Sequence, residues 1–346
     1  MKIPGSILIV RLSSLGDIIH ALPAFHALRA SFPDARIDWV VERKLAFLLS
    51  AVQGIDEVIP IDTRDLRSYP SRASWRRLWQ PIRLLRARRY DIAIDFQGLL
   101  KTAFLCLASG AHERIGFSRD LVRERPAHWF YHRTASKPSS EAHVARLNML
   151  LSEAAGAAHG ELCAHLHPKA EDVEAIEIRL RREQLSEFIV INPGGGWPTK
   201  RWPPARYGDL AVQIQKRLGI RSVVATGPGE ETMYEEIARH CKETPPIHFP
   251  VPFLQLVPLF MKARVVIGGD TGPMHLACAV AAPVVAVMGP TSPVRNGPWS
   301  ERDEVVVRRL PCSFCYGRSC PTNNECMDIS ADEVYEAVVR RLEKAR

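Results

Sequence analysis

Short apolar runs alternate along the chain with longer segments in which apolar residues recur every three or four positions. Because strands inside a parallel sheet are covered on both faces, the apolar runs predict buried strands. The periodic segments predict amphipathic helices. In the first half, the predicted strands are residues 6–11, 37–41, 57–61, 91–95 and 114–117, and the predicted helices are residues 18–31, 75–89, 99–108 and 141–154.

The same alternation returns after the irregular sequence AAGAAHGELCAH. In the second half, the predicted strands are residues 188–192, 221–226, 264–268, 284–288 and 305–308, and the predicted helices are residues 171–183, 204–218, 230–240, 253–262 and 274–281. Strands that alternate with helices indicate an α/β fold with parallel sheets.

We therefore predict two doubly wound, Rossmann-like domains, residues 1–165 and 166–328. A C-terminal helix follows over residues 329–346, with a capping box formed by Ser330 and Glu333. Ligands of such sheets bind beyond the carboxyl ends of the strands. We expect the two domains to face one shared cleft.

The length of 346 residues accords with two domains. No apolar stretch approaches the roughly 18 residues that a membrane-spanning helix needs. The N-terminal sequence MKIPGSILIVRL is interrupted by Arg11 and does not resemble a signal peptide. We expect a cytosolic protein.

The positive charge is concentrated in one segment. The formal net charge is +8, and residues 64–89 contain nine arginines and one acid, Asp65. Such a patch favours a polyanionic partner, which could be a nucleic acid, an anionic membrane surface or a phosphorylated substrate. A solvated helix face is the alternative. Regularly spaced aromatic residues for stacking on bases are missing from the segment, so nucleic acid is disfavoured.

The sequence VVIGGDTGPMHLACA has the pattern of a strand, a glycine-rich turn and a helix. Gly269 and Gly272 permit a close approach of the backbone to a ligand, and Asp270 or Thr271 could cap the helix. The free amides and the dipole at a helix start favour phosphate. His275 follows one turn into the helix. The alternative is an ordinary capped turn.

Two further loops follow predicted strands of the second domain. In INPGGGWPTKRWPP, the backbone amides of Gly195 and Gly196 and the charge of Lys200 could bind phosphate oxygens. In ATGPGEE, Glu230 could accept two ribose hydroxyls. A solvated lysine and a helix cap are the alternatives. Together these loops predict a site for a nucleotide diphosphate, without a carboxylate cluster that would suit catalytic Mg²⁺.

In the first domain, Asp17 lies just beyond the first predicted strand, in VRLSSLGDIIHALPA. A carboxylate at a helix start stays ionised and could accept a proton from a substrate hydroxyl. Ser13 and Ser14 would form a small polar floor beside it. The alternative is that Asp17 only caps the helix.

The motifs SSLGDIIHALPA, YDIAIDFQGLLKTA, PTKRWP, GGDTGPMHLA and GPTSPVRNGPW resemble those of glycosyltransferase family 9, the lipopolysaccharide heptosyltransferases. The resemblance extends over about residues 6–300. The stretch 91–131 is most similar to the heptosyltransferase I branch. The resemblance implies a GT-B fold, with the acceptor bound by the first domain and ADP-heptose by the second.

The resemblance also assigns roles to residues. Asp17 would be the catalytic base, Lys200 would bind phosphate and Glu230 would bind ribose. The motif Asp270, Thr271, Gly272 and His275 would complete the donor site, and basic residues near Arg64, Arg67 and Arg123 would bind the acceptor. Gly195 and Gly196 stand where threonines often precede the lysine, so only backbone donation is expected from them.

The reaction implied is a metal-independent, inverting transfer of heptose from ADP-L-glycero-β-D-manno-heptose to the Kdo sugar of lipid A. The enzyme would be peripheral on the cytoplasmic face of the inner membrane, with its arginines on anionic lipid. One alternative is another acceptor, either a heptosylated core or a protein. Another is an inactive module that only binds a nucleotide sugar.

Four cysteines cluster near the C-terminus with the spacing C-x2-C-x4-C-x5-C, at Cys312, Cys315, Cys320 and Cys326. In a cytosolic protein, four thiols within fifteen residues favour a metal over disulfides. We predict a structural zinc or iron site within segment 312–326. Free thiols on a loop are the alternative.

Overall fold

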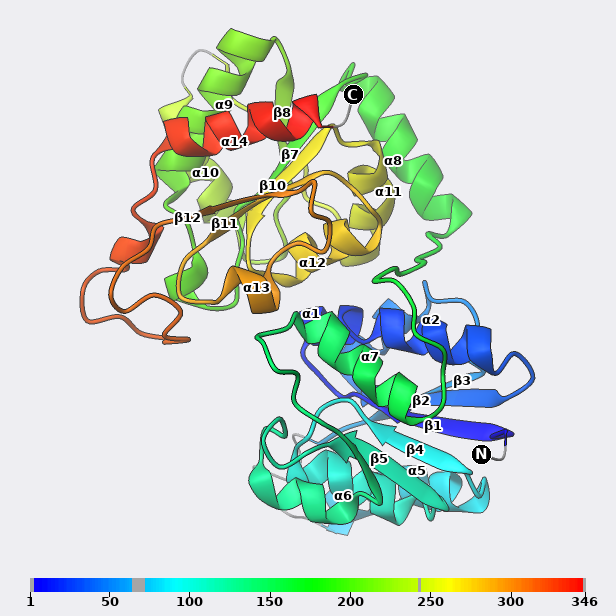
Figure 1. Ribbon diagram of the computed structural model, residues 1–346. Helices are drawn as coiled ribbons and strands as arrows, with labels where there is room; N and C mark the ends of the chain where they lie inside the picture. The colour runs from blue at the N-terminus through cyan, green and yellow to red at the C-terminus, as the bar shows by residue number, and fades with distance from the viewer. Residues whose placement is uncertain (1–2, 64–71, 242–243, 345–346) are drawn as a thin grey trace. The chain divides into compact units, whose positions relative to one another are not determined.

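A computed structural model describes residues 3–63, 72–241 and 244–344. The chain divides into two compact units, Met1–His167 and Pro168–Arg346. The division lies two residues beyond the boundary predicted at residue 165. Each unit contains one parallel sheet with helices on both faces, so the predicted α/β class with two doubly wound domains is confirmed (Figure 1).

The sheet of the first unit has the strand order β3-β2-β1-β4-β5-β6. Its strands are β1 (Ser6–Val10), β2 (Arg36–Glu42), β3 (Glu57–Ile61), β4 (Ile92–Asp95), β5 (Glu113–Phe117) and β6 (Arg133–Ala135). Its α-helices are α1 (Leu15–Ile19), α2 (Leu22–Ser31), α3 (Ala46–Leu49), α5 (Arg72–Ala87), α6 (Leu100–Ala108) and α7 (Val144–Ala154), and its 3₁₀ helices are η1 (Arg43–Leu45) and η2 (Arg125–Phe130).

The sheet of the second unit has the order β12-β11-β10-β7-β8-β9. Its strands are β7 (Phe188–Asn192), β8 (Arg221–Val224), β9 (Ile247–His248), β10 (Val265–Gly269), β11 (Val284–Met288) and β12 (Glu304–Val307). Its α-helices are α8 (Ala170–Arg182), α9 (Pro204–Leu218), α10 (Glu231–His240), α11 (Leu256–Lys262), α12 (Gly272–Ala279), α13 (Pro293–Asn296) and α14 (Ala331–Glu343), and its 3₁₀ helices are η3 (Pro198–Lys200), η4 (Phe253–Gln255) and η5 (Glu325–Met327).

Both sheets reverse their winding direction at one point. In the first unit the chain winds outward from β1 through β2 to β3 and then returns to β4 on the other side of β1. In the second unit β7 and β10 are related in the same way. At such a switch point the two connections leave the sheet in opposite directions, which opens a crevice beyond the carboxyl ends of the strands. The loops after β1 and β4, and those after β7 and β10, are therefore the positions where a ligand is expected.

Apolar residues of the strands pack against the helices that cover the sheets. In the first unit, Leu8 and Val10 of β1 pack with Ile82 and Leu85 of α5 and with Leu105 of α6. Helices α2 and α7 pack together as a separate layer (Figure 1). In the second unit, α9 and α14 form one core with β7 and β10, and α12 packs with α11 and β10. Burial of each large side chain contributes roughly 1.5–3 kcal/mol, so these layers hold the strand ends in place.

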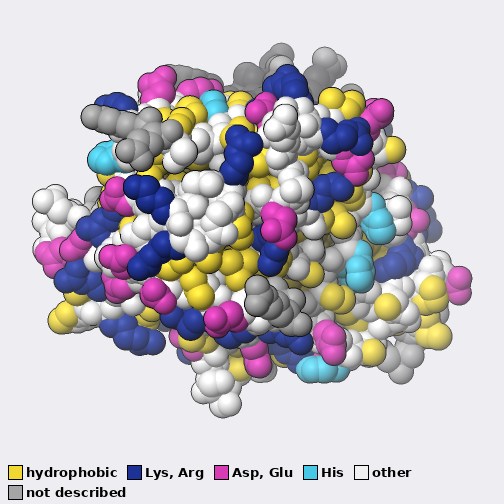
Figure 2. Space-filling view, turned by 90° about the horizontal axis from the view of Figure 1, so that it is seen from above, with side chains coloured by type: hydrophobic (Ala, Val, Ile, Leu, Met, Phe, Trp, Pro, Cys, Tyr) yellow, Lys and Arg dark blue, Asp and Glu magenta, His cyan; other side chains and the backbone are white. Residues whose placement is uncertain are grey.

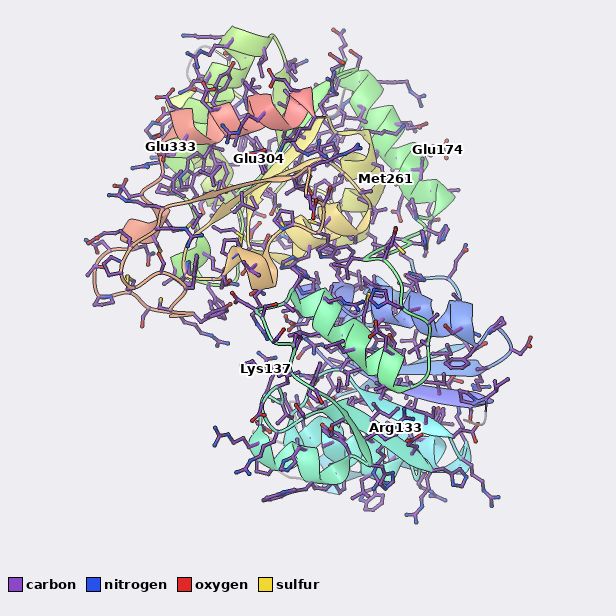
Figure 3. The ribbon with its side chains drawn as sticks, viewed as in Figure 1. Arg133, Lys137, Glu174, Met261, Glu304 and Glu333 are labelled. Atoms are coloured by element: carbon purple, nitrogen blue, oxygen red, sulfur yellow. The ribbon has the colours of Figure 1, made fainter. Side chains whose placement is uncertain are left out.

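The C-terminal helix is part of the second unit. Ser330 and Glu333 form the predicted capping box, with Ser330 N donating to Glu333 Oε2 at 2.8 Å. Glu304 of β12 accepts hydrogen bonds from Arg340 Nε at 3.0 Å and Lys344 Nζ at 2.6 Å. Glu333 and Glu304 are labelled in Figure 3. Within the described part of the chain, no helix is both long and apolar enough to span a bilayer.

The structure differs from the sequence prediction in several elements. The short helices α3 and α13 were not predicted, and residues 253–262, predicted as one helix, form η4 and α11. The helix predicted over residues 18–31 consists of two helices, α1 and α2, separated at His20 and Ala21. Pro23 at the second position of α2 explains the break, because proline lacks the N–H that a continuous helix requires. Strands β6 and β9 were not predicted, since three and two residues are too few to show a pattern.

Candidate active site

Asp17 lies at the switch point of the first unit, as the third residue of α1. Ser14, rather than Asp17, is the N-cap of this helix, and the two residues form a capping box. Ser14 N and Ser14 Oγ both donate to Asp17 Oδ2, at 3.0 and 2.8 Å. These bonds occupy one oxygen of the carboxylate and fix its orientation.

Arg11 holds the other oxygen of Asp17. Its guanidinium lies 2.7 Å from Asp17 Oδ1 and also donates to the backbone carbonyl of Phe96, the residue after β4. Burial alone would raise the pKa of Asp17, but the Arg11 charge, the Ser14 hydrogen bonds and the Arg123 charge outweigh it and lower that pKa. The Asp17 side chain stays 27% exposed while that of Arg11 is 5% exposed. Asp17 is therefore an ionised carboxylate that a ligand can reach.

Asp95, at the end of the neighbouring strand β4, has a different role. It is fully buried, and its carboxylate accepts the backbone amides of Gln97 at 2.8 Å and Gly98 at 3.0 Å and the hydroxyl of Tyr131 at 2.7 Å. Burial raises the pKa of Asp95 despite these bonds. With no exposed surface, Asp95 shapes the loop that supports Arg11 and cannot contact a substrate.

A polar cluster that was not predicted from the sequence lies at the same edge of the sheet. Glu42 ends β2, and its carboxylate accepts a hydrogen bond from the Thr63 hydroxyl. Lys101 Nζ, in the first turn of α6, donates to Thr63 Oγ1 at 3.0 Å. The motif DFQGLLKTA contains Lys101, but only the sheet order places it beside Glu42 at the end of β2 and Thr63 after β3.

The predicted acceptor residues are brought together in part. Ser13 is half-buried and Ser14 is exposed, both between β1 and Asp17. Arg123 is exposed and lies close enough to Asp17 for its charge to lower the pKa of that carboxyl. Arg64 and Arg67 lie outside the described residues.

In the second unit, Lys200, Asp270 and His275 form a connected group at the switch point. Lys200 Nζ lies 2.7 Å from Asp270 Oδ2, and His275 Nε2 donates to Asp270 Oδ1 at 3.0 Å. Burial would raise the pKa of Asp270, but the hydrogen bond and charge of His275 and the charge of Lys200 hold it well below its usual value. The Lys200 ammonium also lies 4.3 Å from the centre of the Trp197 ring. The group thus joins the loop after β7 to the loop after β10.

Helix α12 begins directly beside this group. Gly272 is its first residue and Thr271 its N-cap, with no hydrogen bond from the cap side chain. The first turn of a helix leaves backbone N–H groups without partners inside the helix, and these favour an anion. Three buried hydroxyls near this edge have no hydrogen-bond partner among the described residues: those of Thr271, Thr291 and Ser292. Thr291 and Ser292 follow β11, and no role was predicted for them from the sequence.

The glycine-rich loop after β7 lies against Glu230. A Cβ atom on Gly194 would overlap the Glu230 carboxylate, so any larger residue there would have to displace that side chain. Glu230 Oε2 accepts the backbone N–H of Gly227 at 2.8 Å. A Cβ on Gly195 would lie 3.4 Å from the Thr271 side chain, whereas one on Gly196 would meet nothing within 4 Å. Gly195 and Gly196 were predicted from the sequence, but Gly194 was not, because its role depends on contact with the next loop.

The four cysteines of segment 312–326 line one small cavity of about 20 Å³, beside Thr199 and the loop after β11. That volume holds about one water-sized sphere. The Gly317 backbone N–H donates to Cys315 Sγ at 3.4 Å, and Cys320 Sγ lies 3.5 Å from Thr322 Oγ1. As placed in the described part of the chain, no three His, Cys, Asp or Glu side chains are close enough to hold a metal ion. Metal binding at these thiols stays a prediction.

Two Rossmann-like domains, each with charged groups at the switch point of its sheet, match the architecture of the GT-B class of glycosyltransferases. The family model "Glycosyltransferase family 9 (heptosyltransferase)" matches residues 75–325. The chain belongs to this family, and the resemblance stated from the motifs is confirmed.

Relatives and solved structures agree with this membership. The lipopolysaccharide heptosyltransferase 1 of Pseudomonas aeruginosa is 30% identical over 91% of this chain and 87% of its own length. The glycosyltransferase family 9 protein of Veillonella parvula has a TM-score of 0.83 at 24% identity, over 99% of both chains. The Escherichia coli heptosyltransferase WaaC with ADP-2-deoxy-2-fluoro heptose has a TM-score of 0.74 at 25% identity, over 96% of this chain and 98% of WaaC.

Proposed function

We propose that this glycosyltransferase moves heptose from ADP-L-glycero-β-D-manno-heptose to the Kdo sugar of a lipid A acceptor, by one inverting displacement without a metal ion. The observation that carries the proposal is the partly exposed, ionised carboxylate of Asp17 in one unit, combined with the Lys200–Asp270–His275 group at a helix start in the other. The names of the relatives support the donor and the pathway: one acts on lipopolysaccharide, and another was solved with an ADP-heptose analogue.

The first unit would supply the proton acceptor. As the Kdo hydroxyl oxygen attacks the anomeric carbon, its proton passes to Asp17, and the bond from that carbon to the ADP oxygen breaks on the opposite face. Ser14 donates twice to Asp17 Oδ2 and Arg11 once to Oδ1. Because a carboxylate has about four lone-pair sites, one site on Oδ1 is left for the substrate proton. The lowered pKa keeps Asp17 ready to accept that proton at neutral pH.

The second unit would hold the departing ADP. Lys200 and the first amides of α12, which begins at Gly272, would stabilise the negative charge that grows on the diphosphate. Asp270 and His275 orient Lys200, and Glu230 would bind the ribose hydroxyls. Amides of Gly195 and Gly196 would complete the phosphate contacts. Such preorganised donors act most strongly where charge develops, and loss of one typically costs about 100- to 1000-fold in rate.

The acceptor's lipid would place the first unit on the cytoplasmic face of the inner membrane. Leu100, Phe104 and Leu107 of α6 are spaced along one helix face and are 42%, 49% and 42% exposed. Trp129 of η2, which contacts α6, is 76% exposed. A helix face of this kind can insert shallowly between lipid headgroups. Helix α6 begins two residues after Gly98, so the apolar ridge starts beside the loop that supports Arg11.

Exposed basic side chains lie on α5 and η2, two helices that contact α6. Arg83 and Arg86 of α5 and Arg125 of η2 are exposed, and Trp79 of α5 is 54% exposed. Each basic residue near an anionic membrane contributes about 1 kcal/mol to binding. Arg88 is already neutralised by Asp38 and Glu57. On the face shown in Figure 2, by contrast, basic and acidic side chains are interspersed, which does not favour an anionic surface.

We propose in addition that Cys312, Cys315, Cys320 and Cys326 hold a structural zinc or iron ion. Their shared cavity and the amide donated to Cys315 Sγ support this, because such amide-to-sulfur bonds stabilise thiolate ligands. The ion would fix the segment and take no part in transfer.

A transfer assay with ADP-heptose, comparing Kdo-lipid A with a heptosylated acceptor, tests the proposed reaction. Product with Kdo-lipid A alone is expected. Product with the heptosylated acceptor alone would move the enzyme to a later step, and donor binding without transfer to either would indicate a module that only binds the nucleotide sugar. Activity that disappears with EDTA would contradict metal-independent transfer if the cysteine-bound ion were retained.

A further inference from the structure

We infer that the Tyr316–Gly317 turn of the cysteine-rich segment positions the donor-binding loops, with Thr199 as its contact on the Lys200 side. This inference rests on the proposed function, because it concerns the site assigned above to ADP-heptose. It gives the segment a role in donor affinity, beyond local stability and independent of whether a metal is bound.

The first contact is to the loop that carries Lys200. Thr199 Oγ1 donates to the backbone carbonyl of Gly317 at 2.8 Å, across 118 residues of sequence. Thr199 is 4% exposed and directly precedes Lys200 within η3. The Arg318 guanidinium lies 4.8 Å from the centre of the Trp197 ring. The Lys200 ammonium lies 4.3 Å from the centre of the same ring. The turn therefore contacts η3 at its middle residue, Thr199, and Arg318, which follows the turn, contacts Trp197, the residue just before η3.

The second contact is to the loop after β11. Tyr316 N donates to the Pro290 carbonyl at 2.9 Å, and Ser292 N donates to the Tyr316 hydroxyl at 3.3 Å. The same hydroxyl donates to Asn296 Oδ1 at 3.4 Å. Ser292 lies next to Thr291, and the buried hydroxyls of both lack a partner among the described residues. The turn thus joins the loop after β7 to the loop after β11, and both loops lie beside the switch point.

The backbone of the segment depends on outside contacts for its shape. Phe314 and Tyr316, on either side of Cys315, have φ angles of 65° and 55°. Large side chains rarely adopt this left-handed region, and they stay there only where the surroundings hold them. The anchors of the turn are its thiol cavity and the two donor-site loops. Loss of an anchor on the loop side should let Lys200 move away from the position that Asp270 defines.

The test is calorimetric titration of ADP into the full-length protein and three variants. Thr199→Val removes the hydroxyl that bonds Gly317, while Thr199→Ser keeps it. Tyr316→Phe removes the hydroxyl shared by Ser292 and Asn296 but keeps the ring. We expect Thr199→Val and Tyr316→Phe each to weaken ADP binding about five- to tenfold, since each loses at least one hydrogen bond, and Thr199→Ser to bind like wild type.

A control variant removes a contact near the segment that does not involve the donor loops. Arg308 donates to the Asp328 carbonyl at 3.0 Å and to Asp328 Oδ2 at 2.7 Å, and Arg308→Gln should bind ADP within about twofold of wild type. Steady-state kinetics should show a raised donor KM and an unchanged acceptor KM in Thr199→Val. If Thr199→Val and Tyr316→Phe both bind ADP as wild type does, the inference is wrong. If the wild-type protein does not bind ADP at all, it is the proposed function that fails.

Discussion

The ammonium of Lys200 lies 2.7 Å from the carboxylate of Asp270, and this contact connects the loops after β7 and β10 at the switch point of the second sheet. In the first unit, Arg11 connects the corresponding two loops, because it bonds Asp17 after β1 and the Phe96 carbonyl after β4. In both units a cation joins the two loops where a doubly wound sheet opens. The two ion pairs differ in exposure: the Asp270 side chain is 4% exposed, whereas that of Asp17 is 27% exposed. Asp270 is therefore suited to orient a cation, and Asp17 to meet a substrate.

Lys200→Ala should weaken ADP binding and slow transfer by about 100-fold or more, because it removes the charge proposed to face the leaving diphosphate and leaves the buried carboxylate of Asp270 with His275 as its remaining partner. Calorimetry with ADP and steady-state kinetics measure the two effects. The matched control is Lys262→Ala, since Lys262 also pairs with a carboxylate, Glu177 at 2.8 Å, on the exposed surface of the same unit. Unchanged donor KM and kcat in Lys200→Ala would remove this lysine from the site.

Asp17→Asn should reduce kcat by about 100- to 10,000-fold, because the amide cannot accept the substrate proton. ADP binding should stay within about twofold of wild type. Ser14→Ala separates helix capping from chemistry: it removes the N-cap and should cost about 1 kcal/mol of unfolding free energy, while kcat falls far less. Parallel loss of melting temperature, ADP binding and turnover in Asp17→Asn would show that the carboxylate has only a structural role.

Arg11→Gln should shift the acid limb of the kcat/KM profile to higher pH. As the proposed base, Asp17 would have to be ionised. Its pKa is lowered in the folded protein by the Arg11 charge, so activity should be lost only as pH falls through that lowered value. Without Arg11 the carboxyl protonates at a higher pH. Arg11→Lys keeps the charge and should keep the limb close to that of wild type. A limb that stays in place in Arg11→Gln would mean that another group controls it.

The same pair makes stability depend on pH. Because the pKa of Asp17 is lower in the folded state than in the unfolded chain, the pair stabilises the fold above the ordinary carboxyl pKa, and this contribution disappears as pH falls through the lowered value. Thermal unfolding of wild type and Arg11→Gln should therefore converge at acidic pH.

Most of the strands and helices could be predicted from the sequence because their apolar patterns are local. Parallel strands such as β7 and β10 are continuous apolar runs, and α14 has both its capping box and its basic last turn in sequence. The break between α1 and α2 was not predicted, because the apolar spacing continues through it. Pro23 was the available signal.

The pairing within the site could not be predicted in the same way. Lys200 and Asp270 are 70 residues apart, and Thr199 and Gly317 are 118 apart. Their contact depends on the strand order, which places β7 beside β10 and β11 beyond it. The motifs identified residue types suited to phosphate, but Gly194 gains its importance only from the Glu230 side chain on the next loop.

Phe104→Gln combined with Trp129→Gln should reduce binding to phosphatidylglycerol-containing vesicles by about tenfold or more, because both side chains lose apolar surface that would enter the membrane. Co-sedimentation measures the bound fraction. Met261→Gln is the control, since Met261 is 58% exposed but lies on α11 of the other unit (Figure 3). Binding should also fall as salt is raised, owing to the arginines of α5. Equal sedimentation of the double variant and wild type would exclude the α6 ridge as the membrane surface.

The cysteine segment should contain about one zinc or iron ion per chain when the protein is purified without chelator, as measured by elemental analysis. Cys326→Ser should lose that ion and melt at a lower temperature, because the thiol lies against Gly289 and next to the core residue Met327. Cys163→Ser is the matched control, since Cys163 is an exposed thiol of the first unit, far in sequence from the segment. Its metal content and melting temperature should equal those of wild type. Less than about 0.2 ion per wild-type chain would leave the four thiols as free cysteines. The contacts of Tyr316 and Thr199 would then have to hold the turn without a metal.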